Sequence, residues 1–427
     1  MGKIRYFMQS NRSAIAWALY DWGVFSFTTI VLTFIFAAYF TSRVPADHIL
    51  RTEQWGYAVA IASLIVVILS PIFGAIADYC GPRKPWLFVF TLLTIVGAGL
   101  LWYAYPNANA VYTTLGALII GIIGYEISQV FYNALLPNVA SAQNIGRVSG
   151  WGWGMGDAGG VMALIISLVW FVQGKPAWLN QANAEYVRIC GMFAAVWIAV
   201  FAIPLFMYVP DYPLTQRLSI RHAIAKGFDN LRMTLREWSN ERNLFRFLIA
   251  RMIYIDGLNT VISFGGIYAA GTFSMSLAQV IEFGISLNII IGLGAISCGW
   301  FDDKFGSKKT VFSSLIGMMI VGVPILFVHS ITVFWLLSLI LCFFIGPIQA
   351  ASRSLMVRIA PRENLTQFFG LYTFSGKATA FLGPWMFALL TGLFNTQRAG
   401  MSCVLLFFMV GAWLLWSVKE IPHHANA

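Results

Sequence analysis

Charged residues are scarce in this sequence. Only 10% of its 427 residues are Asp, Glu, Lys or Arg, and 59% are hydrophobic, whereas a soluble domain carries about 25% charged residues. Apolar runs of roughly 20 residues recur along the whole chain, and each is long enough to cross a ~30 Å hydrocarbon core. We therefore predict an all-α polytopic membrane protein.

Sequence motifs for disulfides, metal binding, catalysis and ATP binding are also missing. The five cysteines lie in or beside the apolar runs without a CxxC pair, and the five histidines lack ligand spacing, so neither a disulfide framework nor a metal site is indicated. No HExxH or GxSxG motif argues for an intramembrane enzyme, and we expect no catalytic residues. Because no ATP-binding motif is present and no cofactor is expected, an ion or substrate gradient must drive any transport.

The basic residues indicate topology. Of the 27 Lys and Arg residues, 19 lie in the termini and in loops on one side of the predicted spans, five lie on the other side and three lie inside spans. The positive-inside rule therefore places both termini in the cytoplasm, as in a multi-pass protein of the bacterial cytoplasmic membrane. The net charge of +10 is then a topology signal, and we expect lipids rather than nucleic acid as partners. The predicted spans are 14–40, 54–77, 86–105, 111–136, 148–172, 187–209, 247–272, 276–301, 310–329, 331–356, 367–393 and 399–418.

The chain repeats itself. The stretches "GAIADYCGPRK" and "GWFDDKFGSKK" both fit G-x-x-x-D-x-x-G-x-[RK]-[RK] and lie 225 residues apart, and a second match at an offset of 220 pairs Gln129 with Gln349. Glycines let helix ends approach closely, and an aspartate can accept hydrogen bonds from a helix N-terminus or pair with a cation. We predict a duplicated six-span unit with the site between the repeats. The loop residues predicted to gate it are Gly74, Asp78, Arg83, Gly299, Asp303 and Lys308.

Three regions follow from this duplication: a six-helix bundle over 1–209, a cytoplasmic linker over 210–246 and a second six-helix bundle over 247–427. In the linker, "IRHAIAKGFDNLRMTLREW" has apolar residues at steps of three or four and basic residues between them. This pattern predicts an amphipathic helix. Such a helix either lies on an anionic leaflet or packs across the cytoplasmic ends of the bundles.

The two loop motifs resemble those of the major facilitator superfamily. The stretches "AWALYDW", "FYNALLPNVA", "GRVSGWGWGMGDAGG", "QAASRSLM" and "FFGLYTFSGKATAFLGP" are similar to the vacuole-effluxer branch, typified by a vacuolar amino-acid exporter linked to autophagy. The resemblance implies a fold of two pseudo-symmetric bundles that acts as a monomer. It also implies a small amino-acid-like substrate.

Five ionisable residues form a layer inside the spans: Asp21, Glu126, Asp157, Asp256 and Lys377. Each lies roughly 12–16 Å from the cytoplasmic end of its span, and ionisable groups near the membrane midplane mark a substrate or proton site. The 220-residue offset pairs Asp157 with Lys377, so the two should face each other across a central cavity. They then either bind the two ends of a zwitterion or form a salt bridge that closes one conformation.

The other predicted roles depend on position. Asp21 and Asp256 either carry a cation or proton or are held by neighbouring helix ends, and Glu126 is a candidate for proton coupling. Arg251 and Arg353 lie near the cytoplasmic ends of their spans, where they form gate bridges or snorkel, or else contact a ligand. The remaining candidates for the substrate site are Tyr20, Trp153, Gln129 and Asn259.

These features predict a secondary transporter that moves a small polar, amino-acid-like solute by alternating access, with a proton as the coupling ion. One alternative keeps the fold and changes the cargo to a polyamine, a metal chelate such as a siderophore, or a sugar. A second alternative is a membrane receptor that binds a ligand without net flux.

Overall fold

The computed structural model of the protein describes residues 2–43, 48–211, 229, 232–233, 241–275 and 277–420, and its regular elements over these residues are all helical. Twelve helical segments are long and apolar enough to cross a membrane, which confirms the predicted fold class. The predicted linker helix covers residues 220–238, and all of these except 229, 232 and 233 lie outside the described residues.

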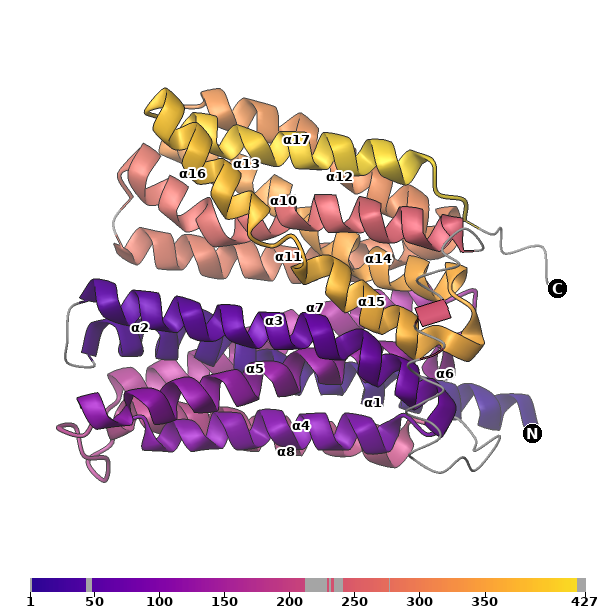
Figure 1. Ribbon diagram of the computed structural model, residues 1–427, viewed down its shortest axis with the longest axis horizontal. Coiled ribbons are helices and arrows are strands. Elements are labelled where there is room, and N and C mark those ends of the chain that lie inside the picture. Colours follow the sequence, from indigo (N-terminus) through magenta and orange to yellow (C-terminus); the bar gives the residue numbers. More distant parts are fainter. Residues whose placement is uncertain are drawn as a thin grey trace.

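Six spans make up the first half of the bundle (Figure 1). Four of them have irregular parts: π-helical turns in the first and fifth spans, a 3-10 turn at the end of the third, and a 3-10 turn before and a short helix after the fourth. Their helices are α1 (Gly2–Ser26), η1 (Phe27–Phe34), α2 (Ile35–Arg43), α3 (His48–Cys80), α4 (Lys84–Leu100), η2 (Leu101–Tyr103), η3 (Ala108–Ala110), α5 (Val111–Ala134), α6 (Leu136–Val139), α7 (Ile145–Ile166), η4 (Ser167–Gln173) and α8 (Glu185–Tyr208).

Six further spans make up the second half, which Figure 1 shows above the first. Two of these spans are interrupted, one at Phe344 and one between Lys377 and Leu382. Their helices are α10 (Arg242–Phe273), α11 (Leu277–Phe305), α12 (Ser307–Phe327), α13 (Ile331–Phe343), α14 (Ile345–Ile359), η5 (Arg362–Asn364), α15 (Leu365–Lys377), α16 (Leu382–Phe394) and α17 (Gln397–Trp416).

Each half has its own apolar core. One cluster of buried side chains runs from Ala14 to Val209, and the other runs from Leu244 to Val418 with two residues added from α5. Helix α4 packs on α5 and α8 in the first half as α12 packs on α14 and α17 in the second. The packing is therefore duplicated along with the sequence.

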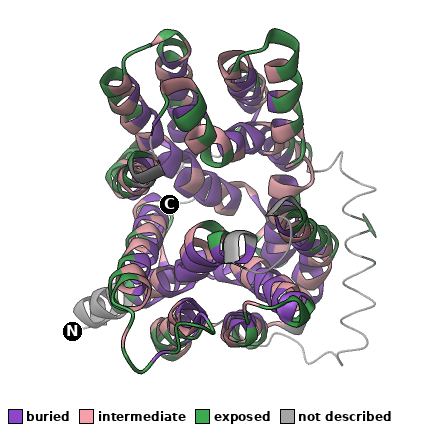
Figure 2. Cartoon of the chain, turned by 90° about the vertical axis from the view of Figure 1, so that its left-hand side faces the viewer, coloured by how far each residue is buried: buried purple, intermediate pink, exposed green. Residues whose placement is uncertain are grey.

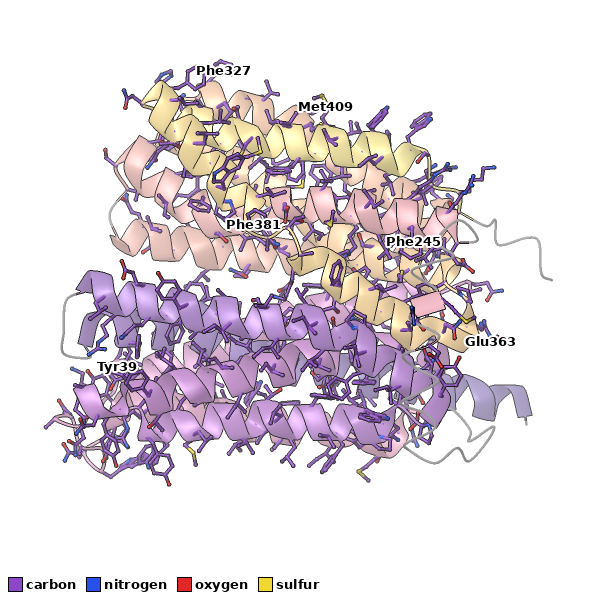
Figure 3. All side chains as sticks on the ribbon, viewed as in Figure 1. Tyr39, Phe245, Phe327, Glu363, Phe381 and Met409 are labelled. Atoms are coloured by element: carbon purple, nitrogen blue, oxygen red, sulfur yellow. The ribbon has the colours of Figure 1, made fainter. Side chains whose placement is uncertain are left out.

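Large apolar side chains cover the outer surface. Figure 2 shows buried residues facing the interior of the bundle and exposed ones facing outward. Phe327, Phe381 and Met409, labelled in Figure 3, are more than half exposed. A soluble protein would bury side chains of this kind, whereas a bilayer is an apolar solvent for them. The outer surface is thus suited to lipid.

The start of α1 and the end of α17 lie at the same end of the bundle (Figure 1), which we call the terminal end. Both loop motifs are found there, since α3 ends at Cys80 and α11 ends at Phe305. The break in the eleventh span divides it into α15, which packs on α3 of the other half, and α16, which packs on α10 and α17. This break places Lys377 at the inner end of α15.

Candidate functional site

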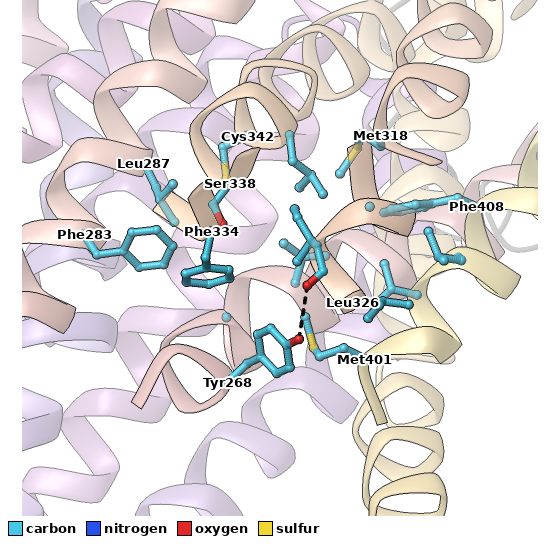
Figure 4. Close-up of a pocket in the computed structure, with 17 residues that line it drawn as sticks. Tyr268, Phe283, Leu287, Met318, Leu326, Phe334, Ser338, Cys342, Met401 and Phe408 are labelled. Atoms are coloured by element: carbon cyan, nitrogen blue, oxygen red, sulfur yellow. Dashed lines mark hydrogen bonds between the residues drawn. The ribbon is translucent and has the colours of Figure 1, made fainter. Parts of the chain in front are cut away.

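A central cavity of about 390 Å³ lies between the two halves. It takes side chains from α1, α5 and α7 of the first half and from α10, α14 and α15 of the second. A smaller cavity of about 60 Å³ within the second half is lined mostly by aliphatic and aromatic side chains, as Figure 4 shows. The central cavity brings charged groups from both halves together. Its described lining residues are Asp21, Phe25, Thr28, Tyr125, Glu126, Gln129, Asn133, Trp153, Arg251, Ile255, Asn259, Ile262, Gln349, Arg353, Tyr372, Thr373, Gly376 and Lys377.

One ion pair spans this cavity. The ammonium of Lys377 on α15 lies 2.8 Å from a carboxylate oxygen of Glu126 on α5. The two side chains are 26% and 18% exposed, so they are accessible from the cavity. Opposite charges that face each other across the two halves can exchange their mutual contact for contacts to a dipolar solute.

A second ion pair lies deeper, and its members are almost fully buried. The Arg353 guanidinium donates to Asp21 at 3.3 Å, with exposures of 3% and 1%. Asp21 also accepts hydrogen bonds from Tyr132 at 2.8 Å and from Gln129 at 3.3 Å. The carboxylate is therefore held by both halves.

Arg353 belongs to α14 but most of its partners belong to the first half. Its guanidinium donates to the Ser149 hydroxyl at 2.9 Å, to the Ser149 carbonyl oxygen at 2.6 Å and to Asn133 at 3.2 Å, and it lies 4.7 Å from the centre of the Trp17 ring. Asn133 and Arg353 are 220 residues apart, the offset of the second internal repeat. Repeat-equivalent positions thus meet at the interface between the halves.

Arg251 differs from the other cavity cations because its partners among the described residues are neutral. It donates to the Tyr372 carbonyl oxygen at 2.7 Å and to the Ser375 hydroxyl at 3.0 Å, and it stacks on the Tyr372 ring at 3.4 Å. Its Nε has no hydrogen-bond partner among the described residues. The sequence placed Arg251 with the gating residues, but its side chain lines the cavity.

The predicted pairing of Asp157 with Lys377 is wrong. Lys377 pairs with Glu126, and Asp157 lines a separate recess between α7 and α11. Helix α7 packs along α11 rather than across the cavity from α15. The aspartate therefore faces Gly292 of α11.

Asp256 and Tyr20 also lie outside the set of residues that line the cavity. Asp256 is 1% exposed, and neither carboxylate oxygen has a hydrogen-bond partner in the part of the chain that the structure describes. The Tyr20 hydroxyl is buried against the Thr91 hydroxyl at 2.7 Å, and its ring stacks on Tyr132. Trp153, Gln129 and Asn259 do line the cavity as predicted.

Several uncharged cavity residues were missed by the sequence interpretation, which started from the charged residues inside the spans. Asn133, Gln349 and Tyr125 are among them. The internal repeat was the available signal for two of them, since the 220-residue offset pairs Gln129 with Gln349 and places Asn133 opposite Arg353.

At the terminal end, the first loop motif binds the second half. The Asp78 carboxylate accepts hydrogen bonds from the backbone N–H groups of Thr366 and Gln367 at 3.1 and 2.7 Å and pairs with Arg83 at 3.1 Å. Gly74 packs directly on the backbone of Thr366, where a Cβ would have no room. The N-terminus of α15 is thereby fastened to α3.

The second loop motif makes the equivalent contact in the other direction. Asp303 accepts hydrogen bonds from the backbone N–H groups of Gly146 and Arg147 at 2.7 and 3.3 Å, and from the Arg147 side chain at 2.7 Å. Gly299 packs against the backbone of the same two residues. The predicted contact of each motif aspartate with a helix N-terminus is confirmed.

The basic residues that occupy the same position in the two motifs do not make the same contacts in the structure. The Lys308 ammonium donates to the Trp416 carbonyl oxygen at 2.8 Å, as that of Lys84 donates to the Val209 carbonyl oxygen at 2.8 Å. Lys308 is therefore the structural counterpart of Lys84. The sequence alignment had matched it with Arg83 instead.

Two more carboxylates cap helix N-termini within the halves. Asp211 accepts hydrogen bonds from the backbone N–H groups of Arg83 and Lys84 at the start of α4, both at 2.9 Å. Glu420 does the same for Ser307 and Lys308 at the start of α12, at 2.8 and 2.9 Å. An anion at a helix N-terminus is stabilised by the free N–H groups and the helix dipole.

Comparisons with known proteins agree with this geometry. The profile of the family described as "Vacuole effluxer Atg22 like" matches residues 55–422. An uncharacterised MFS-type transporter of Bacillus subtilis (strain 168), YxiO, is 27% identical over 97% of this chain and 96% of its own. Autophagy-related protein 22 of Kluyveromyces lactis is 21% identical over 83% of this chain and 76% of its own. Among solved structures, the proton:xylose symporter XylE superposes with a TM-score of 0.74 at 16% identity, covering 97% of this chain and 96% of its own.

Proposed function

This chain belongs to the Atg22-like vacuole effluxer family of membrane transporters, and we propose that its cargo is a small zwitterionic, amino-acid-like solute carried by proton-coupled alternating access. Transport and the major facilitator fold come with the family and its structural relatives. The nature of the cargo and the coupling are inferred from the central cavity.

The observation that supports a zwitterion is the mixed charge of the cavity. A substrate ammonium group can replace Lys377 beside Glu126, and a substrate carboxylate can then bind the released Lys377 and the neighbouring Arg251. Arginine suits this role because its planar guanidinium binds carboxylates with two parallel hydrogen bonds. The volume of about 390 Å³ falls within the range of small-molecule sites.

Alternating access is supported by where the halves are joined. Asp78 and Asp303 hold the halves together at the terminal end, and Arg353 and Lys377 join them at the depth of the cavity. In a rocking mechanism the contacts made by Asp78 and Asp303 would break when that end opens. The described conformation then corresponds to the state closed at the terminal end.

Proton coupling is supported by the Asp21–Arg353 pair. A proton taken up by Asp21 would remove its charge and so weaken its attraction to Arg353. Because Arg353 joins the halves, that loss would favour their separation at the terminal end. Protonation and the conformational change would be linked through this one contact.

An organic anion is the second candidate cargo. The cavity has two acidic residues, Asp21 and Glu126, and three basic ones, Arg251, Arg353 and Lys377. When the two ion pairs are set aside, Arg251 has no carboxylate partner among the described residues, which favours an acidic solute. The same balance disfavours a polyamine.

The test is uptake into proteoliposomes. Labelled amino acids, monocarboxylates, polyamines and sugars are offered with and without an imposed pH gradient. We expect gradient-dependent uptake of an amino-acid class that Glu126→Gln abolishes, with Asp157→Asn as a matched acidic-residue control outside the cavity. Uptake of monocarboxylates that survives Glu126→Gln would favour the organic anion, and uptake that is insensitive to the pH gradient would exclude proton coupling.

We also propose that the protein is a monomer in the bacterial cytoplasmic membrane with both termini in the cytoplasm. The asymmetry of Lys and Arg between loops supports this orientation. Reporter fusions after Glu420 and inside the 175–184 loop test it, since only the first should show cytoplasmic activity. Light scattering of the purified protein measures its mass in the detergent complex.

A further inference from the structure

The recess between α7 and α11 that Asp157 lines is separate from the central cavity. Its volume is about 240 Å³, and none of the described residues that line it also lines the cavity. Met162, Ile165, Ile289 and Leu293 form its rim and are each 44–51% exposed. The recess therefore opens on the apolar outer surface of the bundle, toward the membrane.

One carboxylate lies in this apolar recess. Asp157 is among the lining residues, its Oδ2 is buried without a hydrogen-bond partner among the described residues, and no ion pair joins it to a described cation. A Cβ added at Gly292 would lie 3.3 Å from the Cβ of Asp157, so the glycine lets α11 approach this part of α7 closely.

A second polar group lines the recess beside the aspartate. Asn288 belongs to the lining of the recess, and its amide nitrogen donates to the Gly284 carbonyl oxygen at 2.9 Å. Its amide oxygen is an acceptor. The recess thus offers hydrogen-bond acceptors and a negative charge within apolar walls, which is complementary to a donor with a positive charge and an apolar tail.

Depth restricts the kind of ligand. Asp157 lies 12 residues from the start of α7, which is about 18 Å along the helix, near the middle of a ~30 Å hydrocarbon layer. A carboxylate at this depth is unfavourable in the hydrocarbon layer, and a cationic partner would offset that cost. Phospholipid headgroups stay at the interface, whereas a single-chain primary amine can enter the hydrocarbon layer as its neutral base and so reach this level.

We propose that the α7–α11 recess is a binding site for a lipophilic primary amine. Its ammonium group pairs with Asp157 and donates to the Asn288 amide oxygen, and its alkyl chain lies along the apolar rim. The site is separate from the central cavity and does not depend on what the cavity transports.

The test is photolabelling of the full-length protein in lipid nanodiscs with dodecylamine that carries a diazirine on its chain. We expect labelled peptides from α7 and α11, protection by excess unlabelled dodecylamine, and no protection by dodecanol or dodecanoate. Asp157→Asn should lower labelling at least tenfold. Asp256→Asn, which removes another buried aspartate charge outside the recess, should leave it unchanged.

A blocking variant keeps the test informative if Asp157→Asn does not fold. Ala158→Phe fills the recess from its exposed side while the carboxylate is retained, and it should also lower labelling at least tenfold. Equal labelling of the wild type and these variants would overturn the proposal. So would equal protection by the alcohol, because the recess would then bind alkyl chains without regard to the amine.

Discussion

Replacing Asp78 with asparagine should open the terminal end of the protein. Asp78 accepts two backbone hydrogen bonds from α15 and one from Arg83, and asparagine keeps one acceptor oxygen but no charge. Hydrogen bonds to charged groups contribute about 1.5–3 kcal/mol each, so we expect the closed state to lose about 2–3 kcal/mol. At 1.36 kcal/mol per factor of ten, that shifts the equilibrium between closed and open states by roughly 30- to 150-fold.

The shift is measurable as a distance between the halves. Spin labels at Gln143, in the α6–α7 loop, and at Glu363, in η5, are both on exposed positions at the terminal end (Figure 3 labels the latter). Double electron–electron resonance on the wild type should give one short distance. Asp78→Asn should add a longer component.

Asp211→Asn is the matched control, because Asp211 also caps a helix N-terminus with two backbone hydrogen bonds but does so within the first half. If Asp78→Asn and Asp211→Asn give the same distance distribution, the contacts of Asp78 do not control closure. The reasoning from the geometry of the terminal end would then be refuted.

Three further predictions concern packing and the cavity. Gly74→Ala should abolish uptake because its Cβ would meet the backbone of α15, whereas Gly56→Ala, on the same helix with open space around it, should transport normally. Arg251→Gln should raise the KM for a substrate with a carboxylate about tenfold or more while expression and monodispersity are unchanged; an unchanged KM would remove Arg251 from the site. Glu126→Lys and Lys377→Glu should each abolish uptake, and the double variant should recover part of it; no recovery would argue against a pairing that matters for transport.

The spans and the contacts of the loop-motif aspartates could be predicted from the sequence because their signals are local. A run of about 20 apolar residues has one stable outcome in a bilayer, and the twelve predicted runs all coincide with helices. The motif aspartates also behave as their chemistry requires, since Asp78 and Asp303 both accept hydrogen bonds from helix N-termini.

The direction of each charged side chain could not be predicted, because it depends on helix rotation. The matching stretches "YDWG" and "YIDG" align Tyr20 with Tyr254, an offset of 234 that makes Ile255 the counterpart of Asp21. Ile255 and Asp21 both line the cavity. Asp256 is one residue further along, and one residue turns a helix by about 100°, so its carboxylate is buried away from the cavity instead.

The predicted pairing of Asp157 with Lys377 failed for a similar reason. Their 220-residue spacing makes them equivalent within the repeat. Equivalent residues lie at a similar depth in the membrane, but they do not have to contact each other. Helix α7 packs on α11, and α15 lies against α3 and α5, so Lys377 meets Glu126 on α5. The assembly of the two halves decides which helices face each other across them. Neither repeat alone carries this information.

The four carboxylates that cap helix N-termini at the terminal end form two pairs, one within the halves and one between them. Asp211 and Glu420 each cap a helix of their own half, whereas Asp78 and Asp303 cap a helix of the opposite half. Rocking of the halves would leave the first pair intact and break the second. The groups released by the second pair are carboxylates and backbone N–H groups at the end of the bundle, where water can replace their hydrogen bonds. Opening that end would therefore cost less than separating the buried Asp21–Arg353 pair. Under the proton coupling that we propose, protonation of Asp21 would lower this second cost.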